Sequence, residues 1–406
     1  MKLRLLYLYR WLIWNVVSRL FVFFYLYPRY HFTKSKTSDR LPKPPFVIVS
    51  NHGTFFDPWI VGGFSRYPFA IMCNDEAFSR GSVSSWYLRS TGAYPKKKGA
   101  SDFKAMKQTI SRLSQGYAVC IFPEGQTSWD GETQLLYKGI EKIIRKTGVP
   151  LVVTKVSGNF LTKPWWADVI RKGKISVTYT VVTPERIRAL SDDELFALMR
   201  TSLAHNDVKS PVNKQMPFSG NNLATGLERF VWMCPACKTE DALCTDGNNI
   251  RCGGCGAAWT IDAYCKVMPA NPGLPTVGDL NDWAQWHRAQ VIHKINNGAK
   301  DAILTTSGGV LMRNGKDNLS FANAGLGTMT LTNQTLIFSF DNASGAPTAF
   351  PVSDITMPVI QKQDIVEFSC NGLLYRFVFS RHSPMKWIYY LRYLKGYEKL
   401  EEQGFI

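Results

Sequence analysis

Apolar side chains dominate the start of the chain. Between residues 3 and 27 almost every position is Leu, Val, Ile, Phe, Tyr or Trp, and the polar interruptions are Arg4, Arg10, Asn15, Ser18 and Arg19. No stretch reaches the roughly 18 uncharged apolar residues of a clean membrane span. We therefore predict that residues 1–44 hold one or two helices that end at Pro28 and lie in a membrane interface, with a buried aromatic face and arginines near lipid headgroups. A buried pair of core helices is one alternative, and a true membrane span is another.

Three short apolar runs follow and predict buried strands. They border residues that favour turns, and they cover residues 46–50, 118–122 and 151–153. The first run leads into Asn51-His52-Gly53. A few residues later, Asp57-Pro58 is typical of a helix start, with the aspartate as the cap and the proline in the first helical position.

His52 and Asp57 are the first candidate pair for chemistry. On one continuous helix, residues five apart point about 140° away from each other. The two side chains can therefore face one another only if the chain between them turns, and Gly53 permits such a turn. A histidine in a loop beside a carboxylate on the first helical turn makes a general base and the group that orients it. Taken singly, each residue is more often structural.

Further motifs give this pair a context. They are Phe122-Pro123-Glu124-Gly125, the loop Gly92–Gly99 with three consecutive lysines, Lys138-Gly139, and Val149-Pro150 before the third strand. With these blocks in this order, residues 45–205 resemble the lysophosphatidate acyltransferase (PlsC-like) superfamily of glycerolipid acyltransferases. His52 to Asp57 matches its His-x4-Asp motif. The resemblance implies an α/β acyltransferase domain over residues 45–225, with a mostly parallel sheet flanked by helices.

The resemblance also implies roles for individual residues. His52 would take the proton of an acceptor hydroxyl while that oxygen attacks the thioester of acyl-CoA or of an acyl-carrier protein, and Asp57 would hold the imidazole. Glu124 and Gly125 would shape the acceptor pocket, and Lys98 stands where the family carries a phosphate-binding arginine. The implied activity is that of a glycerolipid O-acyltransferase, with 1-acylglycerol-3-phosphate as the first acceptor and no acyl-enzyme.

Two departures from the family pattern concern the acceptor. Gln126-Thr127 replaces the usual Thr-Arg, and Lys98 offers a point charge in place of a bidentate guanidinium fork. A different lyso-lipid or glycolipid acceptor is therefore the first alternative. A non-catalytic scaffold that binds membrane lipid is the second, although a binding module has no use for a base.

The net charge of +17 is confined to the first 225 residues. Residues 1–46 hold nine basic residues and one acidic residue, residues 47–225 hold 23 and 14, and the rest hold 16 of each. Such a surface favours anionic membrane lipids and a phosphate-bearing or acidic acyl donor. The basic run near the N-terminus comprises Arg29, Lys34, Lys36, Arg40 and Lys43. The neutral C-terminal half argues against a nucleic-acid partner.

Four of the nine cysteines form two Cys-x2-Cys pairs. Cys234 and Cys237 make the first pair, and Cys252 and Cys255 make the second. This spacing predicts a zinc ribbon over residues 228–267, in which four thiolates hold a structural Zn²⁺ that supplies folding free energy. Thiols kept free for metal indicate a reducing compartment, and hence the cytoplasmic face of a membrane. A redox Cys-x-x-Cys is the alternative.

The last part of the chain predicts a β-rich module. Residues 268–300 are predicted to be a linker with a helical patch that carries Trp283 and Trp286. Residues 301–406 show short strands at regular spacing and a closing helix over Pro384–Gln403, a pattern typical of a sandwich or barrel. This region resembles a GRAM or pleckstrin-homology-like (PH-like) domain. A docking or packing module without a lipid ligand is the alternative.

Overall fold

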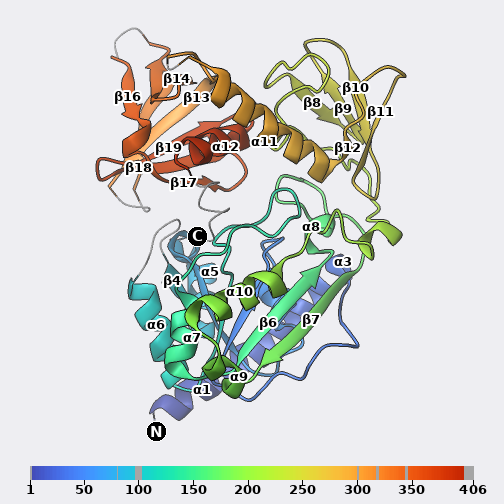
Figure 1. The fold of residues 1–406 in the computed structure, drawn as a ribbon. Helices are drawn as coiled ribbons and strands as arrows, with labels where there is room; N and C mark the ends of the chain where they lie inside the picture. The colour runs from blue at the N-terminus through green and yellow to red at the C-terminus, as the bar shows by residue number, and fades with distance from the viewer. Residues whose placement is uncertain are drawn as a thin grey trace. The chain divides into compact units, whose positions relative to one another are not determined.

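The computed structural model describes residues 2–79, 81–96, 103–299, 301–316, 320–342 and 346–396. These residues form two compact units (Figure 1). The first unit contains the residues up to Trp165 together with Ile170–Gly220, and the second contains Trp166–Val169 and the residues from Asn221 onward. The described residues of the segments 228–267 and 301–406, which the sequence distinguishes, lie in the same unit.

A seven-stranded sheet forms the centre of the first unit. Its strands, in spatial order, are β1 (Phe32–Lys34), β7 (Ile175–Val182), β6 (Leu151–Ser157), β2 (Phe46–Ser50), β5 (Ala118–Ile121), β3 (Phe69–Asn74) and β4 (Tyr94–Lys96). Neighbouring strands run parallel except β6 and β7, which are antiparallel. The predicted mostly parallel sheet is therefore confirmed.

Both faces of this sheet are covered, so its central strands β2 and β5 are apolar at every position but Ser50. In β2, Val47 and Val49 point to one core cluster, and Phe46 and Ile48 point to the other. The first cluster is closed by α6 (Phe103–Ser114), α7 (Ile140–Thr147), α9 (Pro184–Ala189) and α10 (Asp192–Leu203). The second is closed by the N-terminal helix and α4 (Asp57–Gly62). The apolar runs in the sequence are therefore explained by the burial of these strands on both faces of the sheet.

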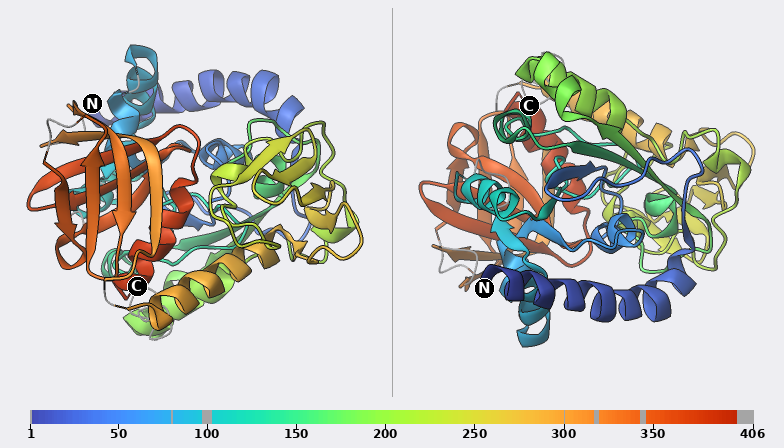
Figure 2. Two further views of the ribbon diagram at one scale, coloured as in Figure 1. Left: turned by 90° about the horizontal axis from the view of Figure 1, so that it is seen from above. Right: turned by 90° about the horizontal axis from the view of Figure 1, so that it is seen from below.

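The N-terminal helix is one rod over residues 2–30 (Figure 2). It contains α1 (Lys2–Leu12), α2 (Arg19–Phe21) and α3 (Tyr27–Tyr30), joined by wider turns at Ile13–Ser18 and Val22–Leu26. The prediction that it ends at Pro28 was wrong. Pro28 lies within α3, directly after the wider turn Val22–Leu26, and the helix ends at Tyr30 because His31 adopts a left-handed conformation.

The surroundings of this helix differ from the prediction at one arginine. Arg4, Arg19 and Arg29 are exposed, as a role near lipid headgroups requires, but Arg10 is buried within the first unit. Many apolar side chains of the helix remain exposed, among them Leu5, Leu8, Leu20, Phe23 and Phe24. By length and composition alone, Arg4–Tyr30 would be sufficient to cross a membrane.

The second unit contains two antiparallel sheets. One has the order β12 (Gly278–Asp279), β11 (Lys266–Pro269), β10 (Ala258–Ile261), β9 (Asn249–Cys252) and β8 (Leu243–Asp246). The other has the order β16 (Thr348–Pro351), β15 (Thr335–Phe340), β14 (Ala322–Leu331), β13 (Thr305–Gly315), β19 (Leu373–Phe379), β18 (Ile365–Cys370) and β17 (Thr356–Gln361). The predicted β-rich region is confirmed.

Two longer helices belong to the second unit. Helix α11 (Leu280–Asn297) carries Trp283, which is fully buried in the core. The closing helix α12 (Pro384–Leu394) begins where predicted but ends earlier than Gln403. Residues 397–406 lie outside the described part of the chain.

Candidate active site

Three parallel strands end at the same edge of the first sheet. Strand β2 lies between β5 and β6 and runs parallel to both, so the segments that leave their carboxyl ends meet there. His52 follows β2, Glu124 follows β5, and Asn159 begins the short helix α8 (Asn159–Thr162) after β6. Residues more than a hundred positions apart are thereby brought together.

His52 and Asp57 face one another as the spacing predicts. The Nδ1 atom of His52 lies 2.8 Å from Oδ2 of Asp57. The aspartate is fully buried, whereas 19% of the histidine side chain is exposed. The imidazole stacks on the Phe122 ring with 4.4 Å between centroids, and its Nε2 lies 3.4 Å from Oγ1 of Thr127. One ring nitrogen is therefore held by a carboxylate, and the other is available to a substrate.

The turn between the two residues depends on the Asp57 carboxylate. Its Oδ2 also accepts hydrogen bonds from the backbone N–H groups of Gly53 (2.7 Å) and Thr54 (2.9 Å). The expected capping role was wrong by one position, because Phe56 precedes the helix and Asp57 is its first residue. The carboxylate holds the preceding loop instead of its own helix. A Cβ atom at Gly53 would lie 2.6 Å from the Asn159 amide, so this position requires glycine.

Glu124 holds the backbone on which His52 lies. Its Oε1 accepts the His52 backbone N–H at 2.7 Å, and its Oε2 accepts the N–H of Gln134 at 2.6 Å. Burial raises the pKa of the Glu124 carboxyl well above its usual value, although these two hydrogen bonds act in the opposite direction. The adjacent Gly125 is exposed and left-handed, and a Cβ there would meet the Tyr137 ring. Lys98 lies outside the described residues.

Sequence reasoning missed Asn159. Its Nδ2 donates to Oδ1 of Asp57 at 2.9 Å, so both oxygens of that carboxylate are occupied. Helix α8 is in turn fixed by the buried Asp207, which accepts the backbone N–H groups of Gly158 and Phe160. No motif marks Asn159, and its position directly after the third predicted strand is the only signal that could have drawn attention to it.

Replacing Asn159 with alanine is expected to lower kcat about tenfold and to leave KM nearly unchanged. The substitution removes one hydrogen bond to an ionised carboxylate, which is worth about 1.5 kcal/mol or more, and frees Asp57 to reorient. Steady-state kinetics with a thioester donor measure this effect. The matched control is Asn213→Ala. It also removes a buried side-chain amide, but that amide donates to Asp207 and not to Asp57. An equal loss of kcat in both variants would show that Asn159 acts only through stability.

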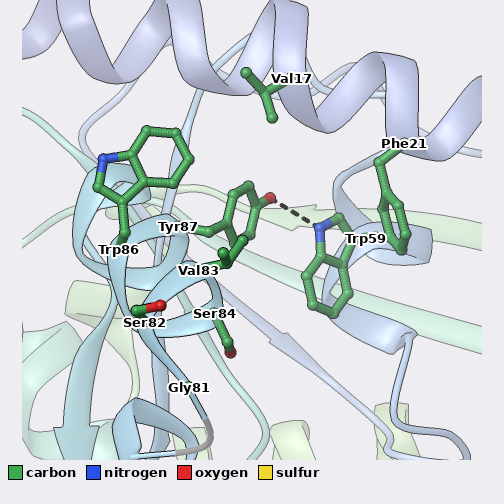
Figure 3. A pocket seen from close by; sticks show the side chains of 9 residues that line it. All are labelled: Val17, Phe21, Trp59, Gly81, Ser82, Val83, Ser84, Trp86 and Tyr87. Carbon is green, nitrogen blue, oxygen red and sulfur yellow. Dashed lines mark hydrogen bonds between the residues drawn. The ribbon is translucent and has the colours of Figure 1, made fainter.

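A hydrophobic pocket adjoins the helix that carries Asp57. It has a volume of about 640 Å³ and lies between the N-terminal helix, α4 and α5 (Ser82–Thr91) (Figure 3). Trp59 is on α4, two residues after Asp57, and its Nε1 donates to the Tyr87 hydroxyl at 2.8 Å. The Ser18 hydroxyl lies 2.7 Å from the same oxygen. The lining residues are Val17, Phe21, Trp59, Gly81, Ser82, Val83, Ser84, Trp86 and Tyr87.

The four predicted metal ligands come together in the second unit. The sulfur atoms of Cys234, Cys237, Cys252 and Cys255 all lie within 4.8 Å of one another. Two of the separations are 3.8 Å and 3.7 Å. Four sulfurs at about 2.3 Å from one ion would stand about 3.8 Å apart, so the cluster could bind a metal in tetrahedral geometry. Hydrogen bonds with Thr239 lower the pKa of the Cys237 thiol to about 6.

Comparisons with known proteins found matches to this part of the chain. Residues 32–156 match the family model described as Acyltransferase. These residues include His52, Asp57 and Glu124. The match supports the prediction of an acyltransferase domain over this part of the chain.

One relative is the chloroplastic 1-acyl-sn-glycerol-3-phosphate acyltransferase BAT2 of Brassica napus. This chain and that relative are 27% identical over 169 residues, which are 40% of this chain and 48% of the relative. The chain thus spans about half the length of that curated relative. The crystal structure of the 1-acyl-sn-glycerophosphate (LPA) acyltransferase PlsC from Thermotoga maritima is similar over 50% of this chain and 93% of its own, with 21% identity and a TM-score of 0.38.

Proposed function

We propose that this protein transfers a fatty acyl group from a thioester donor to the hydroxyl of a lyso-lipid. The observation that carries the proposal is the 2.8 Å contact between His52 Nδ1 and the buried Asp57 carboxylate, in a histidine whose side chain is 19% exposed. A histidine held in this way is a general base. The acyltransferase-family match over residues 32–156 supports the same reaction class.

The reaction proceeds by direct transfer. His52 Nε2 accepts the hydroxyl proton of the acceptor as the oxygen forms a bond to the thioester carbonyl carbon. The carbon–sulfur bond then breaks, and the departing thiolate takes the proton from the imidazolium. Asp57 keeps the proton of Nδ1 in place, which leaves the lone pair of Nε2 free for the acceptor, and it stabilises the imidazolium that forms. No protein nucleophile takes part.

The first acceptor that we propose is 1-acylglycerol-3-phosphate. The printed name of the Brassica napus relative supports this choice, as does the positive charge of the first 225 residues. The donor is acyl-CoA or an acyl-carrier protein. Glu124 and Gly125 shape the acceptor side through the loop that they brace, and Lys98 contributes charge to the acceptor phosphate. The pocket between Trp59 and Tyr87 is large and apolar enough for an acyl chain.

We further propose that the enzyme works at the cytoplasmic face of a membrane. The exposed apolar side chains of the N-terminal helix are supplemented by Val83 and Trp86 of α5, which are 76% and 50% exposed. Apolar groups exposed on this scale are typical of a surface that meets lipid. Exposed Arg4, Arg19 and Arg29 would add attraction to anionic lipids.

For the second unit we propose a zinc ribbon and a PH-like domain. The four sulfur atoms fit a structural Zn²⁺ by their number, chemistry and spacing. The seven-stranded antiparallel sheet followed by α12 supports the PH-like assignment. This domain would serve as a docking module.

Competition between acceptors tests the proposed substrate. Wild-type protein in vesicles should acylate 1-acylglycerol-3-phosphate with a higher kcat/KM than lyso-lipids that lack the phosphate monoester, because this headgroup adds charge-assisted hydrogen bonds. Mass spectrometry of the lipid products measures each rate in one mixture. A preference for a neutral lyso-lipid or a glycolipid would replace the proposed acceptor. Absence of transfer to every hydroxyl offered would refute the activity itself.

A further inference from the structure

Arg10 occupies an environment that its charge does not favour. It lies on the N-terminal helix, is only 5% exposed, and its guanidinium carbon stands 4.6 Å from the centre of the Tyr117 ring. The guanidinium also lies against the backbone at Gly92, where a Cβ atom would come within 2.9 Å of the guanidinium carbon. Its Nε and Nη1 are buried and have no hydrogen-bond partner.

Two neighbouring side chains also have buried polar atoms that form no hydrogen bond. The Nε of Arg112, at the end of α6, and the hydroxyl of Tyr117 are also buried without a partner. Burial, and next the charge of Arg10, lower the pKa of the Arg112 guanidinium. Among the described residues, no carboxylate forms an ion pair with Arg10 or Arg112. Two cations therefore stand close together with no counter-charge in the described part of the protein.

The surroundings compensate for this charge only in part. The Tyr117 ring offers a cation–π contact, and the carboxyl-terminal end of α5 at Gly92 carries a partial negative charge. Neither accepts hydrogen bonds from the buried nitrogen atoms. Native proteins rarely leave buried donors without acceptors, and they pair buried charges. An anion that accepts several hydrogen bonds would satisfy these donors and balance the charge.

We propose that Arg10, Arg112 and Tyr117 form a binding site for a phosphate group. Planar guanidinium forks match the oxygens of phosphate, and the phenol adds a further donor. The site is separate from the candidate active site, because Tyr117 precedes β5 whereas Glu124 follows the opposite end of that strand. The bound phosphate belongs to a lipid headgroup or is free in solution. Either would fix the N-terminal helix to α6 and neutralise the buried charge.

Thermal melting of the full chain provides the first test, with inorganic phosphate compared with chloride at equal ionic strength. Phosphate should raise the melting temperature of wild type, and Arg10→Met and Arg112→Gln should each weaken phosphate binding about tenfold or more. The matched control is Arg89→Gln, which removes an exposed arginine of α5 and should respond as wild type does. Without phosphate, Arg10→Met should melt no lower than wild type, because it removes an unpaired buried charge.

Vesicle binding distinguishes the two sources of phosphate. The probes are vesicles of phosphatidylcholine with and without phosphatidylglycerol. If the ligand is a lipid headgroup, the two site variants lose binding to the anionic vesicles selectively, even where inorganic phosphate has no effect. If Arg10→Met does not fold, the same measurements on Arg112→Gln provide the test, because Arg112 is only half-buried. The proposal is overturned if both site variants respond to both probes as wild type does, or if wild type responds to neither.

Discussion

Replacing His52 with alanine should lower the rate of acyl transfer about a thousandfold and leave the fold intact. General-base assistance typically contributes about 10²–10⁴ to the rate, and no other described group lies beside the Asp57 carboxylate in a position to replace the imidazole. The hydrogen bond from the backbone of residue 52 to Glu124 does not depend on the side chain, so the loop retains its brace. Initial rates with a labelled thioester donor and lyso-lipid vesicles give the measurement.

The chain supplies a matched control for this experiment. His205 is also paired with a buried aspartate, with its Nε2 2.7 Å from Oδ1 of Asp207, and only 12% of its side chain is exposed. Asp207 serves the backbone of α8, so His205→Ala should reduce stability while transfer by the folded protein continues at near the wild-type rate. A folded His52→Ala protein with the wild-type rate, or an equal loss in His205→Ala, would contradict the assignment.

Removing one proposed zinc ligand should unfold part of the second unit. Structural zinc contributes about 10–16 kcal/mol of apparent binding free energy in small zinc-finger peptides, which is comparable to the whole stability of a typical domain. Cys252→Ser eliminates a buried ligand at the end of β9. The strands β8, β9 and β10 are short, so they cannot replace the metal with a core of their own. Bound zinc measured by atomic emission, together with limited proteolysis, reports the change.

The damage should spread from the metal ligands to the neighbouring helices. Glu240 and Asp241 follow the first cysteine pair, and they form ion pairs with Lys294 of α11 and with the fully buried Lys386 of α12. Loss of the ordered loop would leave Lys386 buried without its partner, which is strongly destabilising. Cys244→Ser is the control, since that cysteine is exposed and outside the cluster. Unchanged melting of wild type after complete chelation would argue against a structural metal.

The strands and the contact between His52 and Asp57 were predictable because their signals are local. Residues 46–49 are apolar at every position, as burial on both faces demands, and the turn that joins His52 to Asp57 follows from a glycine within five residues. The same local reasoning misplaced the helix start by one residue. The Asp57 carboxylate accepts three donors from the preceding loop, and the choice between capping a helix and holding a loop depends on packing that the sequence does not display.

The remaining features depend on contacts across the fold. Asn159 contacts Asp57 only because β6 pairs with β2, and no pattern in the sequence predicts that these two strands are neighbours. Arg10 was expected near lipid headgroups, since a helix of mixed arginine and aromatic residues suggests an interface. It is buried because Tyr117 and Gly92 stand on the side of the helix that packs against the sheet domain. Helical periodicity places Arg10 away from the sector shared by Arg4 and Arg19, but it does not identify the groups that Arg10 contacts.

The most direct measurement of the central claim is a rapid-quench experiment with a donor labelled in its acyl group. With a lyso-lipid acceptor present, wild-type protein should move the label to lipid as fast as the donor disappears, with no label on the protein. Without acceptor, the donor should remain intact, because His52 activates the acceptor hydroxyl and no side chain is acylated. Stoichiometric label on the protein, or donor consumption that does not depend on the acceptor, would contradict direct transfer by the His52–Asp57 pair.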